Sequence, residues 1–229
     1  MQTVLTPEHK TGIFIQELKN RFLCEVEIDG ESTVCYVPSS CHLSNFLDLK
    51  GKSVLLAPTQ SKNARTQFAL FAIPYKKNYI LLNTSMANRA VADSIKGRRF
   101  SFLGRRGTIY TEHYVGGYKS DIYIQDTNTI IEVKSVLSTE KCALFPTVFS
   151  ERALKQLEKL RDLLSLGYRV HYSVISLNPY VSSIYFVSDA QFSPLLKSCI
   201  DLGMTISAFS CRIDDNRVYI DKRLQIILP

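Results

Sequence analysis

Residues 120–134 read SDIYIQDTNTIIEVK, two strand-like segments around a turn at 126–129. A two-residue loop through Thr127 and Asn128 would fix the register of a hairpin. The expected pairs are Ile124 with Ile131, Ile122 with Val133, and Asp121 with Lys134. Side chains alternate along each strand, so one face of the hairpin is apolar. The opposite face carries the chemistry-bearing residues Asp121, Tyr123, Glu132 and Lys134.

Two carboxylates on one face of this hairpin indicate a cation site. Asp121 and Glu132 would repel one another unless a cation lies between them. Mg²⁺, or Mn²⁺, is the hard cation that oxygen ligands favour, and the carbonyl of Val133 is a third candidate ligand. Lys134 could orient or help to deprotonate a water, which suits hydrolysis of a phosphodiester. The alternative is a surface Asp–Lys pair with a neighbouring Glu, which is common on exposed strands.

The sequence pattern of the whole chain predicts two domains, and this hairpin lies in the second. Residues 1–83 contain six short β-rich segments separated by turn signals, which fits an OB-type β-barrel. Residues 84–229 alternate helices with strands, which predicts an α/β domain. The expected helices cover 85–96, then the stretch from Ser150 to Gly167, and a third one that begins at Pro194. The predicted fold class is therefore α/β (α+β), with the barrel first.

The charge of the chain favours a polyanionic partner. The 229 residues carry a formal net charge of +7. Residues 95–110 contain basic side chains and no acidic one, interleaved with aromatic residues, as in a phosphate-contacting surface. The arginines there are Arg98, Arg99, Arg105 and Arg106. A solvated strand and turn is the alternative.

Several classes of protein fit the sequence poorly. No apolar run is long enough to span a bilayer, and residues 1–8 lack a signal-peptide pattern, so we expect a soluble, cytoplasmic protein. The six cysteines form no CxxC pair and are expected to be free thiols. A zinc site at Cys35, Cys41 and His42 lacks a second ligand pair. The sequence contains no Walker A loop, no GxGxxG motif and no Ser/His or Cys/His constellation.

The hairpin resembles the PD-(D/E)XK nuclease superfamily, in which Asp is followed about ten residues later by Glu-x-Lys. The order of motifs along nearly the whole chain is similar to the sugar fermentation stimulation protein (SfsA) family. The most specific blocks are EVKSV at 132–136 and ALFP at 143–146. The chain departs from the family at 39–43, at Thr147, and at Ala153 and Gln156. The resemblance implies an OB-type barrel followed by a restriction-endonuclease-like domain, and a DNA-binding protein with a nuclease-type metal site.

Carried over by position, the resemblance implies further site residues. Asp121, Glu132 and Lys134 match the metal and catalytic positions, and Asp93 and Glu112 are candidates for an additional metal-binding acid. The candidate nucleic-acid contacts besides the arginines at 98–106 are Arg21, Arg65, Arg152, Lys155 and Gln156. For Arg65 the alternative is a plain hairpin loop, and for the last three a solvated helix face. Candidate base-stacking rings are Phe22, Tyr36 and Phe100.

The sequence leaves three hypotheses about function. The first is a Mg²⁺-dependent nuclease in which Asp121 and Glu132 bind metal and Lys134 handles water. The second is a non-catalytic DNA-binding protein, regulatory and linked to sugar fermentation. The third is an enzyme of sugar metabolism, which only the family's name suggests, since no residues describe a sugar pocket. A homodimer is compatible with all three.

Overall fold

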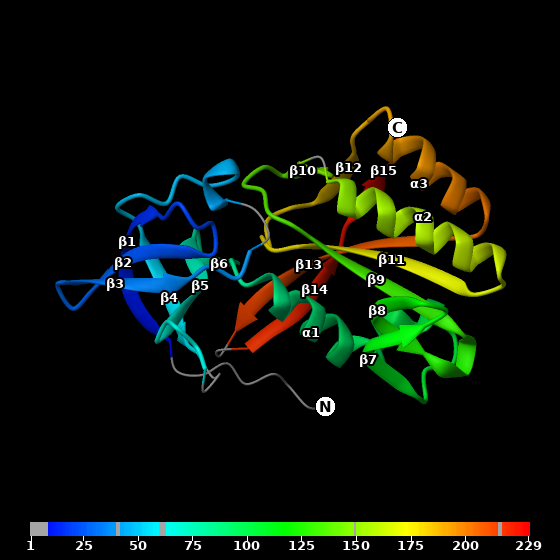
Figure 1. Cartoon of the computed structure of the whole chain (residues 1–229), viewed down its shortest axis with the longest axis horizontal. Coiled ribbons are helices and arrows are strands. Elements are labelled where there is room, and N and C mark those ends of the chain that lie inside the picture. Colours follow the sequence, from blue (N-terminus) through cyan, green and yellow to red (C-terminus); the bar gives the residue numbers. More distant parts are fainter. Residues whose placement is uncertain (1–8, 40–41, 60–62, 149, 215–216) are drawn as a thin grey trace.

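The structure, a computed structural model, describes residues 9–39, 42–59, 63–148, 150–214 and 217–229. Six strands of the N-terminal part form one unit, and the remaining elements form a second unit packed beside it (Figure 1). The predicted boundary at residue 83 falls between the last of these six strands and the first long helix.

The N-terminal unit is a small barrel. Its strands are β1 (Lys10–Glu17), β2 (Leu23–Ile28), β3 (Glu31–Tyr36), β4 (Ser53–Pro58), β5 (Phe68–Tyr75) and β6 (Asn78–Leu81). They are ordered β3-β2-β1-β4-β5-β6, and a parallel bridge between Tyr36 and Ala69 joins β3 to β5 and closes the barrel. Alternation places Cys24, Val26 and Ile28 inside. The predicted OB-type barrel is confirmed.

Gly12 on β1 marks a close approach between strands of the barrel. A Cβ built at this position would lie 2.5 Å from a methyl carbon of Val26 and 2.8 Å from the carbonyl oxygen of Glu27. Only glycine leaves room for that backbone contact. The interior of the barrel is therefore tightly packed around β1, its first strand.

The second unit has mixed α/β content, as predicted. Its helices are α1 (Thr84–Ser94), α2 (Glu151–Ser165) and α3 (Phe192–Asp201), with short 3₁₀ segments η2 (Arg98–Leu103) and η3 (Gln125–Thr127). The strands of its main sheet are β7 (Ile109–Val115), β8 (Tyr118–Ile124), β9 (Thr129–Val136), β11 (Arg169–Ser176), β13 (Thr205–Asp214) and β14 (Arg217–Arg223). Their order is β14-β13-β11-β9-β8-β7, with β9, β11 and β13 parallel.

Helices cover both faces of this sheet (Figure 1). Buried residues of α1 pack with those of the barrel against one face, and buried residues of α2 and α3 pack against the other. A second, three-stranded parallel sheet consists of β10 (Cys142–Phe145), β12 (Ser183–Phe186) and β15 (Gln225–Ile227). The sequence pattern did not predict β10.

The predicted turn and register of the 120–134 hairpin are wrong, whereas the predicted faces are right. The observed pairs are Ile122–Ile131, Tyr123–Ile130 and Ile124–Thr129, two positions from the expected register. A four-residue connection with η3 replaces the two-residue loop, and it ends at Asn128 in the left-handed region (φ 51°). Because the offset is even, each side chain stays on its predicted face. Asp121 therefore does not lie opposite Lys134.

The two units share one hydrophobic core. A single cluster of buried side chains runs from barrel residues such as Phe71 through α1 to Ile131 of β9 and Phe209 of β13. The backbone N–H of Leu81 donates to the carbonyl of Leu177 at 3.0 Å, which ties the last barrel strand to the second unit. The division near residue 83 thus lies inside a continuous packed interior.

Five cysteines of the described residues are free, and four of them are buried. Cys142 is the exposed one, and Cys41 lies outside the described residues. Cys35 faces Cys24 across β2 and β3 inside the barrel. In the described part of the chain, no helix has both the length and the apolar character that crossing a membrane requires.

Candidate functional site

The candidate site lies at a fork where β8 and β9 separate. The two strands are paired from Ile122 to Ile124 on β8, and Asp121 stands just outside this paired stretch. Its Oδ2 accepts a hydrogen bond from the backbone N–H of Val133 at 2.8 Å. Its Oδ1 accepts one from the side-chain amide of Asn88, on α1, at 3.1 Å. The carboxylate of Asp121 thus connects β8, β9 and α1.

Glu132 is the buried carboxylate of the fork, with 2% of its surface exposed. The hydroxyl of Tyr118 donates to its Oε2 at 2.5 Å, and Nζ of Lys134 donates to its Oε1 at 2.6 Å. The same Nζ donates to Oε1 of Gln156, on α2, at 2.7 Å. The fork therefore brings together predicted catalytic residues from β8 and β9 and holds them between α1 and α2.

Burial controls the electrostatics of this site. Removal from water, with repulsion from Glu132, raises the pKa of Asp121 to about 7, although the N–H of Val133 and Lys134 oppose that rise. Burial, with the charge of Glu132, also raises the pKa of Tyr118 well above its ordinary value, so its hydroxyl stays a donor. Lys134 is the cation bonded to Glu132 in this cluster. Asp121 and Glu132 are neighbouring carboxylates, and Lys134 is bonded to only one of them. Additional positive charge beside them would therefore be favourable.

The two candidate additional acids lie in different places. Asp93 is exposed on α1, five residues beyond Asn88. Glu112 is exposed on β7, where its φ is 52°, and pairs with Lys119. Its charge contributes to the raised pKa of Asp121, so Glu112 is the acid that acts on the fork. Among the described residues, no three His, Cys, Asp or Glu side chains are grouped as a metal site.

The donor set at the fork fits a hard divalent cation, which the nuclease resemblance implies. Carboxylate oxygens of Asp121 and Glu132 are the ligand type that Mg²⁺ prefers, and water commonly fills its other positions. Burial and the charge of Glu132 raise the pKa of Asp121, which disfavours its charged form, whereas nearby positive charge favours it. A cation there would supply that charge.

Two of the four arginines at 98–106 donate hydrogen bonds to backbone carbonyls and so stabilise the fold. Nε of Arg99 donates to the carbonyl of Asp221 at 2.8 Å. The guanidinium of Arg106 donates to the carbonyls of Phe100 and Gly104 at 2.8 and 2.7 Å. Arg98 is exposed, and the exposed Arg105 pairs with Asp126 at 3.3 Å. Fewer arginines of this segment are therefore available to contact phosphates than the sequence contains.

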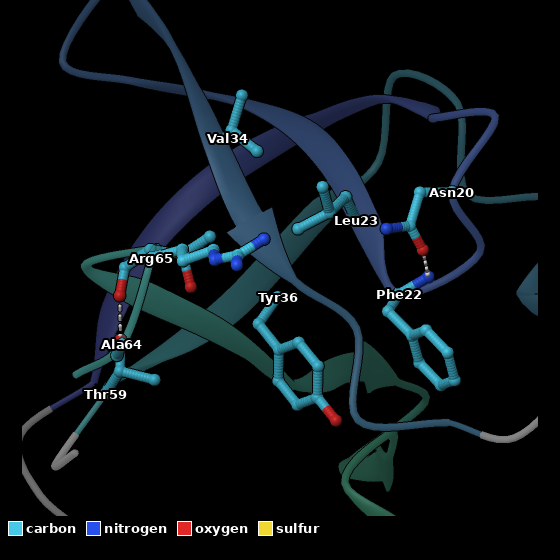
Figure 2. Close-up of a pocket in the computed structure, with 9 residues that line it drawn as sticks. Asn20, Phe22, Leu23, Val34, Tyr36, Thr59, Ala64 and Arg65 are labelled. Carbon is cyan, nitrogen blue, oxygen red and sulfur yellow. Dashed lines mark hydrogen bonds between the residues drawn. The ribbon is translucent and has the colours of Figure 1, made fainter.

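The other candidate phosphate contacts divide between α2 and the barrel. Arg152 and Lys155 are exposed in the first turns of α2, whereas Gln156 is bonded to Lys134 at the fork. Arg21 is exposed, with its guanidinium 4.8 Å from the centre of the Phe22 ring. Arg65 lines a cavity on the barrel (Figure 2). These placements do not test the predicted contacts with nucleic acid.

The candidate base-stacking rings differ in how far they are exposed to solvent. Phe22 and Tyr36 are each 38% exposed, whereas Phe100 is fully buried and its ring packs at 44° to that of Phe209 in the core. The prediction that Phe100 could stack on a base is wrong. Its position in an apolar and basic segment gave no sign that η2 would turn the ring inward.

Two residues of the fork were missed by sequence reasoning. Tyr118 lies 14 positions before Glu132, and Asn88 lies 33 positions before Asp121. Alternation along β8 assigns Tyr118 to the side of Ile122, opposite to Asp121 and Tyr123, and so gives no sign that its hydroxyl reaches Glu132. No local pattern links Asn88, on α1, to a carboxylate on β8.

Comparison with known proteins covers both units. Residues 18–82 match the model of the SfsA N-terminal OB domain, and residues 85–217 match that of the sugar fermentation stimulation protein RE domain. A sugar fermentation stimulation protein homolog of Caldanaerobacter subterraneus subsp. tengcongensis is 33% identical over 226 residues, covering 95% of this chain and 96% of its own. A homolog of Ruminiclostridium cellulolyticum is 27% identical over 227 residues, covering 96% of this chain and 97% of its own.

A solved structure has the same fold. SfsA of Pyrococcus furiosus, in complex with Ca²⁺, superimposes with a TM-score of 0.85 at 21% identity and covers 99% of each chain. At that level of identity the likeness concerns the fold.

Proposed function

Because this chain belongs to the sugar fermentation stimulation protein family, we propose that it is a DNA-binding protein whose β8–β9 fork is a metal-dependent phosphodiester-hydrolysing site of the PD-(D/E)XK type. The observation that carries the proposal is the convergence of Asp121, Glu132, Lys134 and Gln156 from three elements on one buried cluster. Buried charged groups of this kind are frequent at active sites. The complex of the P. furiosus protein with Ca²⁺ also supports a hard divalent cation.

Each residue of the fork then has a role. Asp121 and Glu132 would hold the cation, which would supply positive charge for the scissile phosphate. Tyr118 fixes the orientation of Glu132 through one oxygen, and Asn88 fixes Asp121. Lys134, held between Glu132 and Gln156, orients the attacking water or stabilises the negative charge that develops on its oxygen as it loses a proton. Exposed Arg152 and Lys155 on α2 stand beside Gln156, where they can bind backbone phosphates.

The test is cleavage of labelled single- and double-stranded DNA in Mg²⁺, in Mn²⁺ and in EDTA. Glu132→Gln and Asp121→Asn keep the shape of each side chain while removing its charge. We expect metal-dependent cleavage that falls by about 100-fold or more in either variant, the scale for removing one group that stabilises the transition state. Glu158→Gln, at an exposed position of α2, is the matched control and should cleave like the parent. Equal cleavage by the parent and both fork variants would contradict the proposed site.

A second candidate function is a non-catalytic DNA-binding protein. It is favoured by the ion pair that Lys134 already makes with Glu132, and by the lack of a three-acid group among the described residues. Under this hypothesis the protein binds DNA in a salt-sensitive manner through exposed arginines, without cleavage in any metal. Binding without cleavage under every condition of the test above would select it. Mg²⁺-dependent cleavage that Glu132→Gln abolishes would exclude it.

A further inference from the structure

The barrel carries a cavity of about 390 Å³ that the fork does not use. Its walls come from three parts of the barrel: the β1–β2 loop with Phe22, the faces of β2 and β3 with Val34 and Tyr36, and the β4–β5 loop with Arg65. In OB-folds, the face of strands 2 and 3 and these two loops are where oligonucleotides bind. The cavity therefore lies on the part of the barrel suited to nucleic acid.

Two aromatic rings form an exposed platform in this cavity. The rings of Phe22 and Tyr36 are nearly parallel, 18° apart, with centroids separated by 6.5 Å. Figure 2 shows the two rings side by side, with neither ring covering the other. Each ring is 38% exposed, so part of its surface is accessible to a ligand. Two adjacent open ring faces suit two successive flat ligands such as nucleobases.

The charge around the platform suits a polyanion. Arg65 extends its guanidinium across the cavity toward β2 and β3 (Figure 2). The guanidinium of Arg21 lies over the ring of Phe22. Among the described residues, those lining the cavity include no acidic side chain. Positive charge beside stacking rings is the combination that single-stranded nucleic acid requires, with phosphates on arginine and bases on rings.

A short path of surface connects this platform to the fork. Two residues after Tyr36, the carbonyl of Pro38 accepts hydrogen bonds from the backbone N–H and the hydroxyl of Thr84, at 3.3 and 3.0 Å. Thr84 begins α1, and Asn88 lies one turn later, about 6 Å along the axis. Asn88 donates to Asp121. The half-buried Thr84 and Asn88 and the exposed Arg89 leave this path open to solvent.

We propose that the barrel cavity binds unpaired nucleobases on Phe22 and Tyr36, so that the substrate of the fork is single-stranded nucleic acid or the unpaired stretch of a duplex. Paired bases stack on one another and do not offer their faces to the rings. The part of the inference that concerns cleavage rests on the proposed function, whereas binding on the barrel does not. The contacts from Pro38 to Asp121 link the platform to the fork along the start of α1.

The test measures binding of a fluorescent oligothymidine and of a duplex of the same length, by anisotropy, to the full chain in EDTA. We expect Tyr36→Ala and Phe22→Ala each to raise the single-strand Kd about 10-fold, the scale for loss of one stacked base, and to change the duplex Kd less than 2-fold. Tyr36→Phe keeps the ring and should bind like the parent. Tyr114→Ala removes a ring that is 72% exposed on β7 and should also bind like the parent.

Two results would overturn the inference. One is parental single-strand affinity in both alanine variants, with unchanged far-ultraviolet circular dichroism. The other is an equal loss for single strand and duplex, which indicates a surface that contacts phosphates without reading bases. Phe22 lies in a loop, so its variant tests the platform even if Tyr36→Ala disturbs β3. Because EDTA removes the metal, these results are independent of whether Glu132→Gln abolishes cleavage.

Discussion

At the scale of single residues, the two oxygens of Glu132 have different partners. Tyr118 donates to one and Lys134 to the other, so the carboxylate cannot rotate without breaking a hydrogen bond. A buried carboxylate without partners would be strongly unfavourable. Tyr118 is therefore a positioning residue for Glu132, and its hydroxyl can be removed without changing the charge of the fork.

Tyr118→Phe should reduce metal-dependent cleavage about 10-fold, and the affinity for Mg²⁺ by a similar factor, because partners of metal ligands commonly contribute on this scale. Calorimetric titration with Mg²⁺ measures the affinity without depending on cleavage. Tyr123→Phe is the matched control, since its hydroxyl donates to Asn128 at the other end of β8. Equal effects of the two substitutions would show that Tyr118 has no specific role at Glu132.

His171 predicts how stability depends on pH. It is 1% exposed on β11, bonded to the hydroxyls of Thr205 and Ser207, and burial, with Arg223 nearby, lowers its pKa from 6.5 to about 3. Between these values the unfolded chain binds a proton that the folded chain does not. The contribution of His171 to the free energy of unfolding should therefore fall as the pH is lowered from 6.5, by up to about 1.4 kcal/mol per pH unit. Asp121, whose raised pKa lets the folded chain bind a proton first, contributes with the opposite sign over the same range.

Urea unfolding at pH 7, 6, 5 and 4 measures this dependence. His171→Gln should remove this contribution, so that lowering the pH destabilises the variant less than the parent, whereas Thr205→Val keeps the histidine and should keep the parent's slope. A slope that is the same in the parent and in His171→Gln would assign it to other groups.

At the scale of elements, the β8–β9 hairpin depends on its unusual turn. Asn128 ends η3 in the left-handed region, where its side chain accepts a hydrogen bond from the hydroxyl of Tyr123 at 2.8 Å. Asparagine tolerates this conformation, and β-branched residues do not. The turn sets the register of β8 against β9, and therefore sets which residues meet at the fork.

Asn128→Val should lower the free energy of unfolding by about 1–2 kcal/mol, because the branched side chain disfavours a positive φ. Asn128→Gly removes the same hydrogen bond but adopts the same φ, so its loss should be smaller. Chemical denaturation of both variants gives the comparison. If Gly were as destabilising as Val, the hydrogen bond to Tyr123 and not the backbone conformation would be the main contribution of Asn128.

At the scale of the whole molecule, the continuous core predicts that both units unfold together. Leu81 is fully buried at the end of β6, where its N–H bonds the carbonyl of Leu177. Leu81→Ala should lower the free energy of unfolding by about 2–5 kcal/mol, while the half-exposed Leu144→Ala should change it little. Hydrogen exchange read separately on barrel strands and on β9 and β11 should show the same loss of protection in Leu81→Ala. Loss confined to the barrel would mean that the units are independently stable.

Local pattern predicted the barrel, the helices and the face that carries Asp121, Glu132 and Lys134, because each depends on alternation or on caps within one element. It missed the turn length, since the sequence around Asn128 allows both a two-residue loop and a 3₁₀ turn. It also missed Tyr118 and Asn88, whose roles arise when β8, β9 and α1 meet. Arg99 and Arg106 counted as surface charge in the sequence, yet they donate to backbone carbonyls.

The hydrophobic core that the two units share has a consequence for how the protein evolves. Side chains on both sides of residue 83 fit together around Leu81 and α1, so a substitution on one side changes what is tolerated on the other. Recombination that joined the barrel of one lineage to the second unit of a diverged lineage would bring together surfaces that had not been selected to match. The two halves are therefore expected to pass through evolution as a single heritable unit.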